Sequence, residues 1–155
     1  METFFEYEFL RERRYRPALT LEGGVKWPTA SDPDLGDPGT NYSIGLIASK
    51  DFVYFDLDLE ALYTFIGDPA ERDLLELSPA IEVPLNYRFD FIAEVVESIR
   101  TGAHIEDASG GEFEATVGFA WYVNKYLKLE QGVVFKERGE YQIVFAWEYS
   151  FAGEN

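Results

Sequence analysis

Apolar and polar residues alternate with a period of two along most of the chain, which is the pattern of β-strands with two unlike faces. In residues 141–151 the large apolar side chains occupy the odd positions, and smaller or polar ones occupy the even positions. Residues 55–65, 87–97 and 113–123 repeat this arrangement. No segment shows a sustained helical period. The pattern therefore predicts an all-β protein with four long amphipathic strands.

Five shorter or less regular segments complete the set of predicted strands. They are residues 5–9, 18–27, 41–49, 75–85 and 127–136. Proline cannot donate a hydrogen bond to a strand ladder, so Pro79 predicts a bulge or an early bend within residues 75–85. We therefore expect about nine strands.

The predicted connections alternate between long and short. Residues 28–40 and 98–111 are long and rich in Gly, Pro and Asp, and residues 66–73 and 136–140 are intermediate. Tight turns are expected at residues 50–51, at Asn86 and at residues 124–125. Such alternation predicts an antiparallel up-and-down meander that curls into a barrel, with loops at one end and turns at the other. We expect residues 1–155 to form a single domain.

An odd number of strands has a consequence for closure. The last strand, 141–151, runs from the loop end to the turn end, and with nine strands the first, 5–9, runs the same way. These strands could meet only in parallel, whereas bacterial single-chain membrane barrels have even strand numbers. We therefore expect an incomplete barrel, with an odd number of N-terminal strands missing and an open or strained seam.

The large apolar face has two interpretations: it points inward in a soluble barrel and outward to lipid in a membrane barrel. Across nine strands the apolar face has more than about forty positions, many of them large. A barrel of about eight to ten strands has an interior that a modest number of side chains fills, so these side chains would overfill it. The opposite face is rich in small residues that suit a crowded interior: Ala18, Thr20, Gly24, Ser43, Gly45, Ser49, Thr64, Ser78, Ala80, Thr116, Gly118, Ala120, Gly132, Ala146 and Ser150. This distribution favours the outward interpretation.

Aromatic residues gather near the strand ends, as in the interfacial girdles of outer-membrane barrels. Those near strand ends are Trp27, Tyr42, Tyr63, Phe65, Tyr87, Trp121, Tyr141, Tyr149 and Phe151. In a soluble β-protein the same residues would be ordinary core aromatics. Under the membrane interpretation, the candidate lipid-facing residues are Leu57, Leu59, Phe89, Phe91, Phe119, Trp121, Phe145, Trp147 and Phe151.

The polar face is strongly acidic. It carries the acids Glu6, Glu8, Glu22, Asp56, Asp58, Glu60, Glu76, Glu82, Asp90, Glu94, Glu112, Glu114, Glu130 and Glu148, against the cations Lys26, Arg88, Lys128 and Lys136. In a lumen such a face would favour cations over anions; alternatively, some acids lie at the mouths or pair with these cations. The candidate lumen-lining residues are Glu22, Lys26, Asp56, Asp58, Glu60, Glu82, Arg88, Asp90, Glu94, Glu114, Lys128, Glu130 and Glu148.

Composition excludes several functions. The net charge of −16 argues against a nucleic-acid partner, because binding phosphates needs clustered cations. There is no cysteine and only one histidine, His104, and no catalytic constellation stands out. Asp56, Asp58 and Glu60 lie two apart on one strand face without a matching sugar cleft, and Asp32, Asp34 and Asp37 sit in a sequence typical of turns. We expect no enzyme activity, no cofactor and no metal site.

Several segments resemble one family of outer-membrane barrels. The run PALTLEGGVKWPTASDPDLGDPGTNYSIGLIASKDF at residues 17–52, with YTFIGDP, EVPLNYRFDFIAEVVE, EATVGFAWYVNKYLKLEQGVVF and YQIVFAWEYSF further on, is similar to the β-barrel family named for the MetA pathway of phenol degradation. The resemblance covers roughly residues 5–151. Members of that family carry a signal peptide and further N-terminal strands, neither of which is visible here, so we expect an N-terminally truncated member.

The resemblance implies an outer-membrane channel or transporter of a Gram-negative bacterium for small molecules, with aromatic compounds as one candidate class. Its partners would be the lipid bilayer, a small-molecule solute and the outer-membrane assembly machinery, which reads the C-terminal strand, here 141–151. Two alternatives stay open: a soluble β-barrel that binds an apolar ligand in its interior, and an assembly module whose exposed strand edges pair with other chains.

Overall fold

The computed structural model describes residues 2–28, 39–68, 72–101 and 112–150. It is built from nine strands and has no helix in these ranges. The strands are β1 (Glu2–Leu10), β2 (Ala18–Lys26), β3 (Asn41–Asp51), β4 (Asp56–Phe65), β5 (Asp73–Asn86), β6 (Phe89–Thr101), β7 (Glu112–Asn124), β8 (Leu127–Lys136) and β9 (Tyr141–Tyr149). The described part of the chain thus has no helix long and apolar enough to cross a membrane.

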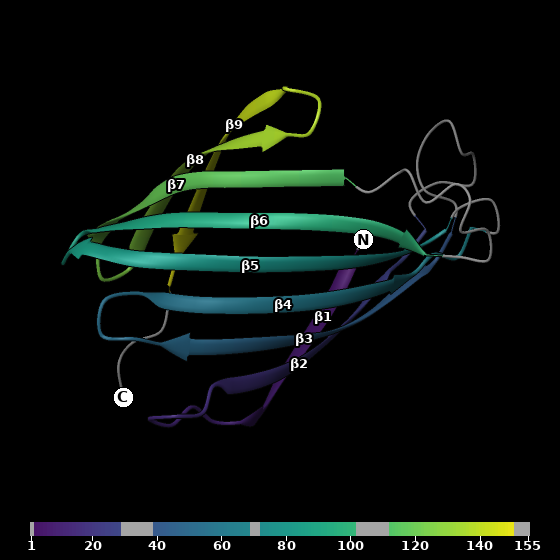
Figure 1. Cartoon of the computed structure of the whole chain (residues 1–155), viewed down its shortest axis with the longest axis horizontal. Helices are drawn as coiled ribbons and strands as arrows, with labels where there is room; N and C mark the ends of the chain where they lie inside the picture. Colours follow the sequence, from purple (N-terminus) through teal and green to yellow (C-terminus); the bar gives the residue numbers. More distant parts are fainter. Residues whose placement is uncertain (1, 29–38, 69–71, 102–111, 151–155) are drawn as a thin grey trace.

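All nine strands belong to one antiparallel sheet, in which each strand pairs with the next in sequence. The predicted up-and-down meander is therefore confirmed (Figure 1). Residues 11–17, 52–55, 87–88 and 125–126 connect strands at one end of the sheet, which we call the turn end. The other ends of these strands lie at the opposite end of the sheet, which we call the loop end.

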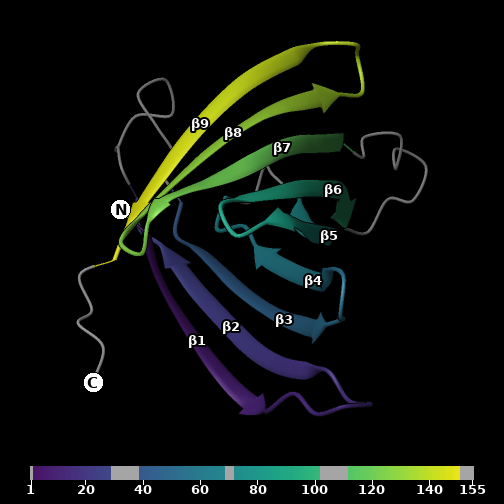
Figure 2. The ribbon, with the colours of Figure 1, turned by 90° about the vertical axis from the view of Figure 1, so that its left-hand side faces the viewer.

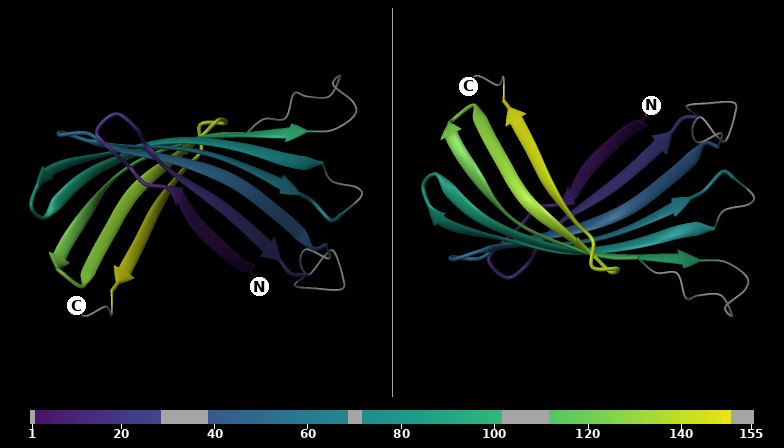
Figure 3. Two further views of the ribbon diagram at one scale, coloured as in Figure 1. Left: turned by 90° about the horizontal axis from the view of Figure 1, so that it is seen from below. Right: turned by 90° about the horizontal axis from the view of Figure 1, so that it is seen from above.

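The sheet is strongly curved but does not close into a barrel. Its two arms bend toward the same side, as Figures 2 and 3 show, yet β1 and β9 form no ladder and no contact with each other. Both edge strands run from the loop end to the turn end. The expected open seam between the first and last strands is therefore confirmed.

Three local expectations were wrong. Pro79 causes no bulge: the β5–β6 ladder omits Ser78 and Pro79 but keeps the same register on both sides, and the shift lies between Pro84 and Asn86. Proline thus costs local hydrogen bonding without displacing the strand. Residues 98–101 continue β6, because Asp73 and Leu74 of the long β5 pair with Thr101 and Arg100.

The third correction concerns the predicted turn at residues 50–51. Lys50 and Asp51 are still in β3, where they pair with Leu57 and Asp56 of β4. The connection is residues 52–55, in which the rings of Phe52 and Phe55 stack with their centroids 4.7 Å apart. This ring contact and the Phe52 N–H bond to the Phe55 carbonyl close the turn two residue pairs further along the ladder than predicted.

The few buried side chains of the sheet lie on its polar face, whereas its apolar face is largely exposed. Apart from glycines, the buried residues in the described ranges are Ala18, Glu22, Asn41, Asp90 and Ala120, and all five lie on the face that carries the acids. No large side chain is fully buried there. The polar face is therefore the concave one, and the convex face presents most of the large apolar side chains outward.

Candidate functional site

The concave face is the most distinctive chemical surface of the described chain. The ladder registers place all fourteen acids of the polar pattern on this one face. Residues that are directly opposed on successive strands form rows across it, such as Glu6–Glu22–Gly45–Leu62–Glu76–Ser98–Glu112. Of the candidate lumen-lining residues, Arg88 alone lies outside a strand, in the β5–β6 turn, where it stacks on Tyr87.

A cluster near the turn end contains both signs of charge. The Tyr122 hydroxyl donates to Glu82 Oε1 at 3.5 Å, and Asp90 lies beside both groups. Lys128 forms an ion pair with Glu130 at 2.7 Å, and its ammonium lies 5.7 Å from the centre of the Tyr122 ring. The acids of this cluster therefore have a cation of the protein itself, Lys128, beside them.

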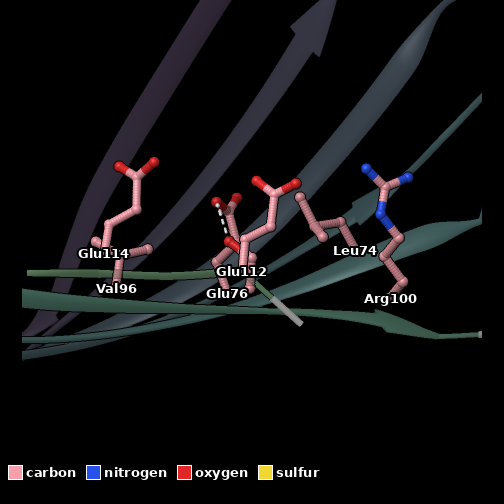
Figure 4. Close-up of a pocket in the computed structure, with 7 residues that line it drawn as sticks. Leu74, Glu76, Val96, Arg100, Glu112 and Glu114 are labelled. Atoms are coloured by element: carbon pink, nitrogen blue, oxygen red, sulfur yellow. Dashed lines mark hydrogen bonds between the residues drawn. The ribbon is translucent and has the colours of Figure 1, made fainter. Parts of the chain in front are cut away.

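A shallow pocket lies on the same face, toward the loop end. Its volume is about 220 Å³, and Glu76, Glu112, Glu114 and Arg100 are among its lining residues. Figure 4 shows these side chains rising from β5, β6 and β7 on the same side of the sheet, with the Ser98 hydroxyl bonded to Glu76 Oε1 at 3.3 Å. Because ligand pockets usually have volumes of about 300–1,000 Å³, this one is small for an organic ligand.

A second group of acids occupies the middle of the concave face and is called here the central carboxylate cluster: Glu6, Glu22, Glu60, Glu76 and Glu94. Glu6 and Glu22 are directly opposed on β1 and β2. Glu22 in turn faces Gly45 of β3, and a Cβ atom at Gly45 would overlap Oε1, Cγ and Cδ of Glu22. The glycine therefore lets the Glu22 side chain cross β3 toward β4.

Beyond Gly45, Glu22 reaches Glu60. The two carboxyl groups interact electrostatically with each other, although their strands are not adjacent. Glu22 is only 9% exposed, and its Oε1 atom is buried without a hydrogen-bond partner. The charged groups that act most strongly on Glu22, Glu60 and Glu94 are other carboxylates. The cluster therefore differs from the one at the turn end, which has Lys128.

One ion pair was not expected from the sequence. Lys50 Nζ, near the end of β3, bonds the carboxylate of Glu12 in the β1–β2 connection and also the Asp51 carbonyl oxygen, the latter at 2.9 Å. The bond from Lys50 lowers the pKa of Glu12 below its usual 4.5. A separation of 38 residues gives no sequence signal, so only the fold reveals this pair.

The convex face carries the candidate lipid-facing residues. Leu59, Phe89, Phe119, Trp121, Phe145 and Trp147 are exposed, whereas Leu57 and Phe91 are half-exposed. Aromatic pairs lie near both ends of the sheet. Tyr42 opposes Phe65 at the loop end, and near the turn end the rings of Phe89 and Trp121 stack with their centroids 6.0 Å apart. Aliphatic residues such as Ile44, Leu46, Leu59, Leu77, Val117 and Ile143 occupy the middle.

Some positions considered from the sequence lie outside the described residues. These are Phe151, the aspartates Asp32, Asp34 and Asp37, and His104. Within the described ranges, no three His, Asp or Glu side chains converge closely enough to hold a metal ion. The acidic run of Asp56, Asp58 and Glu60 lies along β4 on the concave face, with Asp56 opposite Glu82 and Asp58 opposite Ala80.

Comparisons with known proteins add no family assignment. No protein-family model matches the chain. A search of curated proteins also finds no relative with significant sequence similarity.

Proposed function

We propose that this chain forms part of the wall of an outer-membrane β-barrel that passes small molecules, of the kind that its sequence resembles, the barrel family of the MetA pathway of phenol degradation. The convex face would contact lipid, and the concave acidic face would line the path of the solute. The C-terminal strand would be read by the assembly machinery of a Gram-negative outer membrane.

One observation carries the proposal: the described sheet has an exposed apolar convex face and a polar concave face. Most of the exposed large apolar side chains in the strands lie on the convex face, and the buried non-glycine residues of the described ranges are small or polar. A sheet of this kind cannot be stabilised in water by an apolar core, because it has none. In a bilayer the convex face would be buried by lipid, as in outer-membrane barrels.

Strand length and aromatic placement add support. The strands are nine to fourteen residues long, and a membrane-spanning β-strand needs about nine to eleven. Tyr42 and Phe65 near one end, and Phe89 and Trp121 near the other, occupy the positions of interfacial belts around an aliphatic middle.

The alternative of a soluble barrel with an apolar ligand inside has less support. Such a barrel would direct its apolar residues into the interior, whereas here the concave face carries carboxylates. The third alternative, an assembly module, has one supporting observation, which is that β1 and β9 each leave one edge unpaired. Edge pairing is compatible with a membrane wall that needs further strands to close.

The test is whether the purified chain needs an amphiphile to fold. We expect it to show strand circular dichroism and a cooperative unfolding transition in detergent micelles or lipid vesicles, and to aggregate after the detergent is removed. A monodisperse, folded, detergent-free species would contradict the proposal. A fluorescent apolar dye that binds inside such a species would favour the soluble barrel.

A further inference from the structure

The central carboxylate cluster contains a buried acid with an unsatisfied oxygen. Glu22 is more than nine-tenths buried, and its Oε1 atom has no hydrogen-bond partner. Burying a charged carboxylate without a partner is costly, so an ionised Glu22 is stabilised by a cation or a hydrogen-bond donor placed beside it. The Glu22 carboxylate lies over Gly45, between its neighbours Glu6 and Glu60.

The arrangement concentrates negative charge from strands that are not all adjacent. Glu6 directly opposes Glu22, which is an unfavourable cross-strand pair of like charges. Glu60 reaches Glu22 across β3 and also interacts electrostatically with Glu76 and Glu94. A cation bound here would offset this repulsion and would supply the partner that Glu22 Oε1 lacks.

The surroundings distinguish between kinds of cation. In the described ranges, no three acidic side chains converge closely enough for a metal ion, whereas a primary ammonium has three N–H donors that can reach more widely spaced acceptors. Leu62 lies directly opposite Gly45, and Ile47 lies directly opposite Glu60. These two half-buried side chains give a short alkyl chain an apolar surface beside the carboxylates.

We propose that Glu22, Glu60 and Glu6 form a binding site for a small organic cation with a primary ammonium group, which Gly45 makes possible by leaving room for the Glu22 side chain. The site rests on the proposed function in one respect, because the concave face must be the side that meets the solute. It narrows the solute class of that face to alkylammonium compounds.

The probe for this site is butylammonium chloride, titrated into the full chain folded in a zwitterionic detergent and followed by saturation-transfer NMR. We expect saturable binding to the wild type and no saturable binding of 1-butanol, which has the same alkyl chain without the charge. Glu22→Gln and Glu60→Gln should each weaken binding at least tenfold. Glu148→Gln, on the same face but in β9, should change it less than twofold.

A charge-neutral variant separates the geometry from the net charge. Gly45→Ala places a methyl group where the flexible end of Glu22 lies, so the strand should persist while the carboxylate moves aside. We expect butylammonium binding to weaken several-fold with the strand circular dichroism unchanged. This variant also keeps the proposal testable if Glu22→Gln does not fold.

Three results would overturn the proposal. Equal weakening by Glu148→Gln would show only diffuse attraction to an acidic face. Unchanged binding in both Glu22→Gln and Glu60→Gln would show that butylammonium binds somewhere other than at this pair. Displacement of butylammonium by equimolar calcium chloride would identify a metal site. Each can be observed only in a chain that folds in detergent, so failure of this site is distinguishable from failure of the proposed function.

Discussion

The aromatic ring of Phe5, in the edge strand β1, covers Gly23, its directly opposed partner in β2. A Cβ atom at Gly23 would overlap the end of the ring, so the contact exists because the glycine has no side chain. Phe4 covers Gly24 in the same way on the other face. The outermost strand is thus held to the sheet by aromatic rings that lie over glycines. Glycine weakens a strand because it has no side chain to pack, and the ring of the facing residue covers the exposed backbone there.

We predict that Phe5→Ala loosens β1 selectively, by about 0.2–1 kcal/mol, the range for a cross-strand pair. Amide hydrogen exchange should accelerate in β1 and the facing edge of β2 and stay unchanged in β5–β7. A double-mutant cycle with Gly23→Ala checks the cause, since the added methyl already displaces the ring. The costs of the two changes should then be non-additive, and strict additivity would mean that the ring does not lie on the glycine.

The lipid-facing assignment predicts an asymmetry between two neighbouring residues of β9. Phe145 is 73% exposed on the convex face, whereas Ala146 faces the concave side and pairs with Glu130. Phe145→Arg should reduce the free energy of folding into lipid vesicles by roughly 2–4 kcal/mol if this position lies near the bilayer midplane. Ala146→Arg, the same new side chain on the acidic face, should cost much less. Equal costs would contradict the assignment of the faces.

Alternation along the sequence was sufficient to predict which residues share a face. The odd and even positions of residues 113–123, for example, separate Phe119 and Trp121 from Gly118 and Ala120, as the registers confirm. A period of two does not reveal which face is concave, because curvature depends on the twist of the whole sheet. Burial of Glu22 and Asp90 decided this point.

Contacts between distant strands were beyond sequence analysis for a different reason. The approach of Glu22 to Glu60 requires the registers of both β2–β3 and β3–β4, and a slip of one residue would turn either acid to the other face. The sequence shows that Gly45 has no side chain, but it does not show that the side chain of Glu22 passes over this residue. The true ends of β5 and β6 were also hidden, since Ile99, Arg100 and Thr101 are part of a strand only because β5 pairs with them.

The acidity of the concave face predicts cation preference in any conductance. That face carries fourteen acids, and in the described ranges ion pairs at Glu8, Glu114 and Glu130 leave most of them without a cation. Reversal potentials in a salt gradient should therefore indicate cation selectivity. Replacing Glu60 and Glu94 together by Gln should reduce the selectivity, and replacing Glu137 and Glu140, outside the strands, should have little effect. Anion selectivity of the wild type would rule out this face as the lining.

The ion pair between Glu12 and Lys50 predicts a contribution to stability that is lost at acid pH. The pKa of Glu12 is lowered in the folded chain by the Lys50 bond, so the pair stabilises the fold fully above about 4.5, the unfolded value. This contribution is lost as the pH falls through the lower folded pKa. The unfolding midpoint should therefore fall below pH 4.5 more in the wild type than in Glu12→Gln. Identical pH profiles for the two proteins would show that the pair adds nothing.

The open seam gives the last prediction. No Cα atom of β1 lies within 8 Å of one in β9, and a disulfide needs Cα atoms about 4.4–6.8 Å apart. The chain has no cysteine, so any disulfide that forms can be assigned to the introduced cysteines. Cysteines at Phe5, Tyr7 or Phe9 combined with one at Ile143, Phe145 or Trp147 should form no disulfide within a chain in detergent. These combinations cover several registers of a closed seam.

A control for the seam comes from two strands that do pair. Leu46 and Ala61 are directly opposed on β3 and β4, so Leu46→Cys with Ala61→Cys should oxidise within the chain under the same conditions. Rapid intrachain oxidation across β1 and β9 would show that the sheet closes and that a parallel pair completes it. Oxidation between chains would instead show that two copies meet at these edges. In that case β1 of one copy lies beside β9 of the other, and strands from a second copy complete the wall.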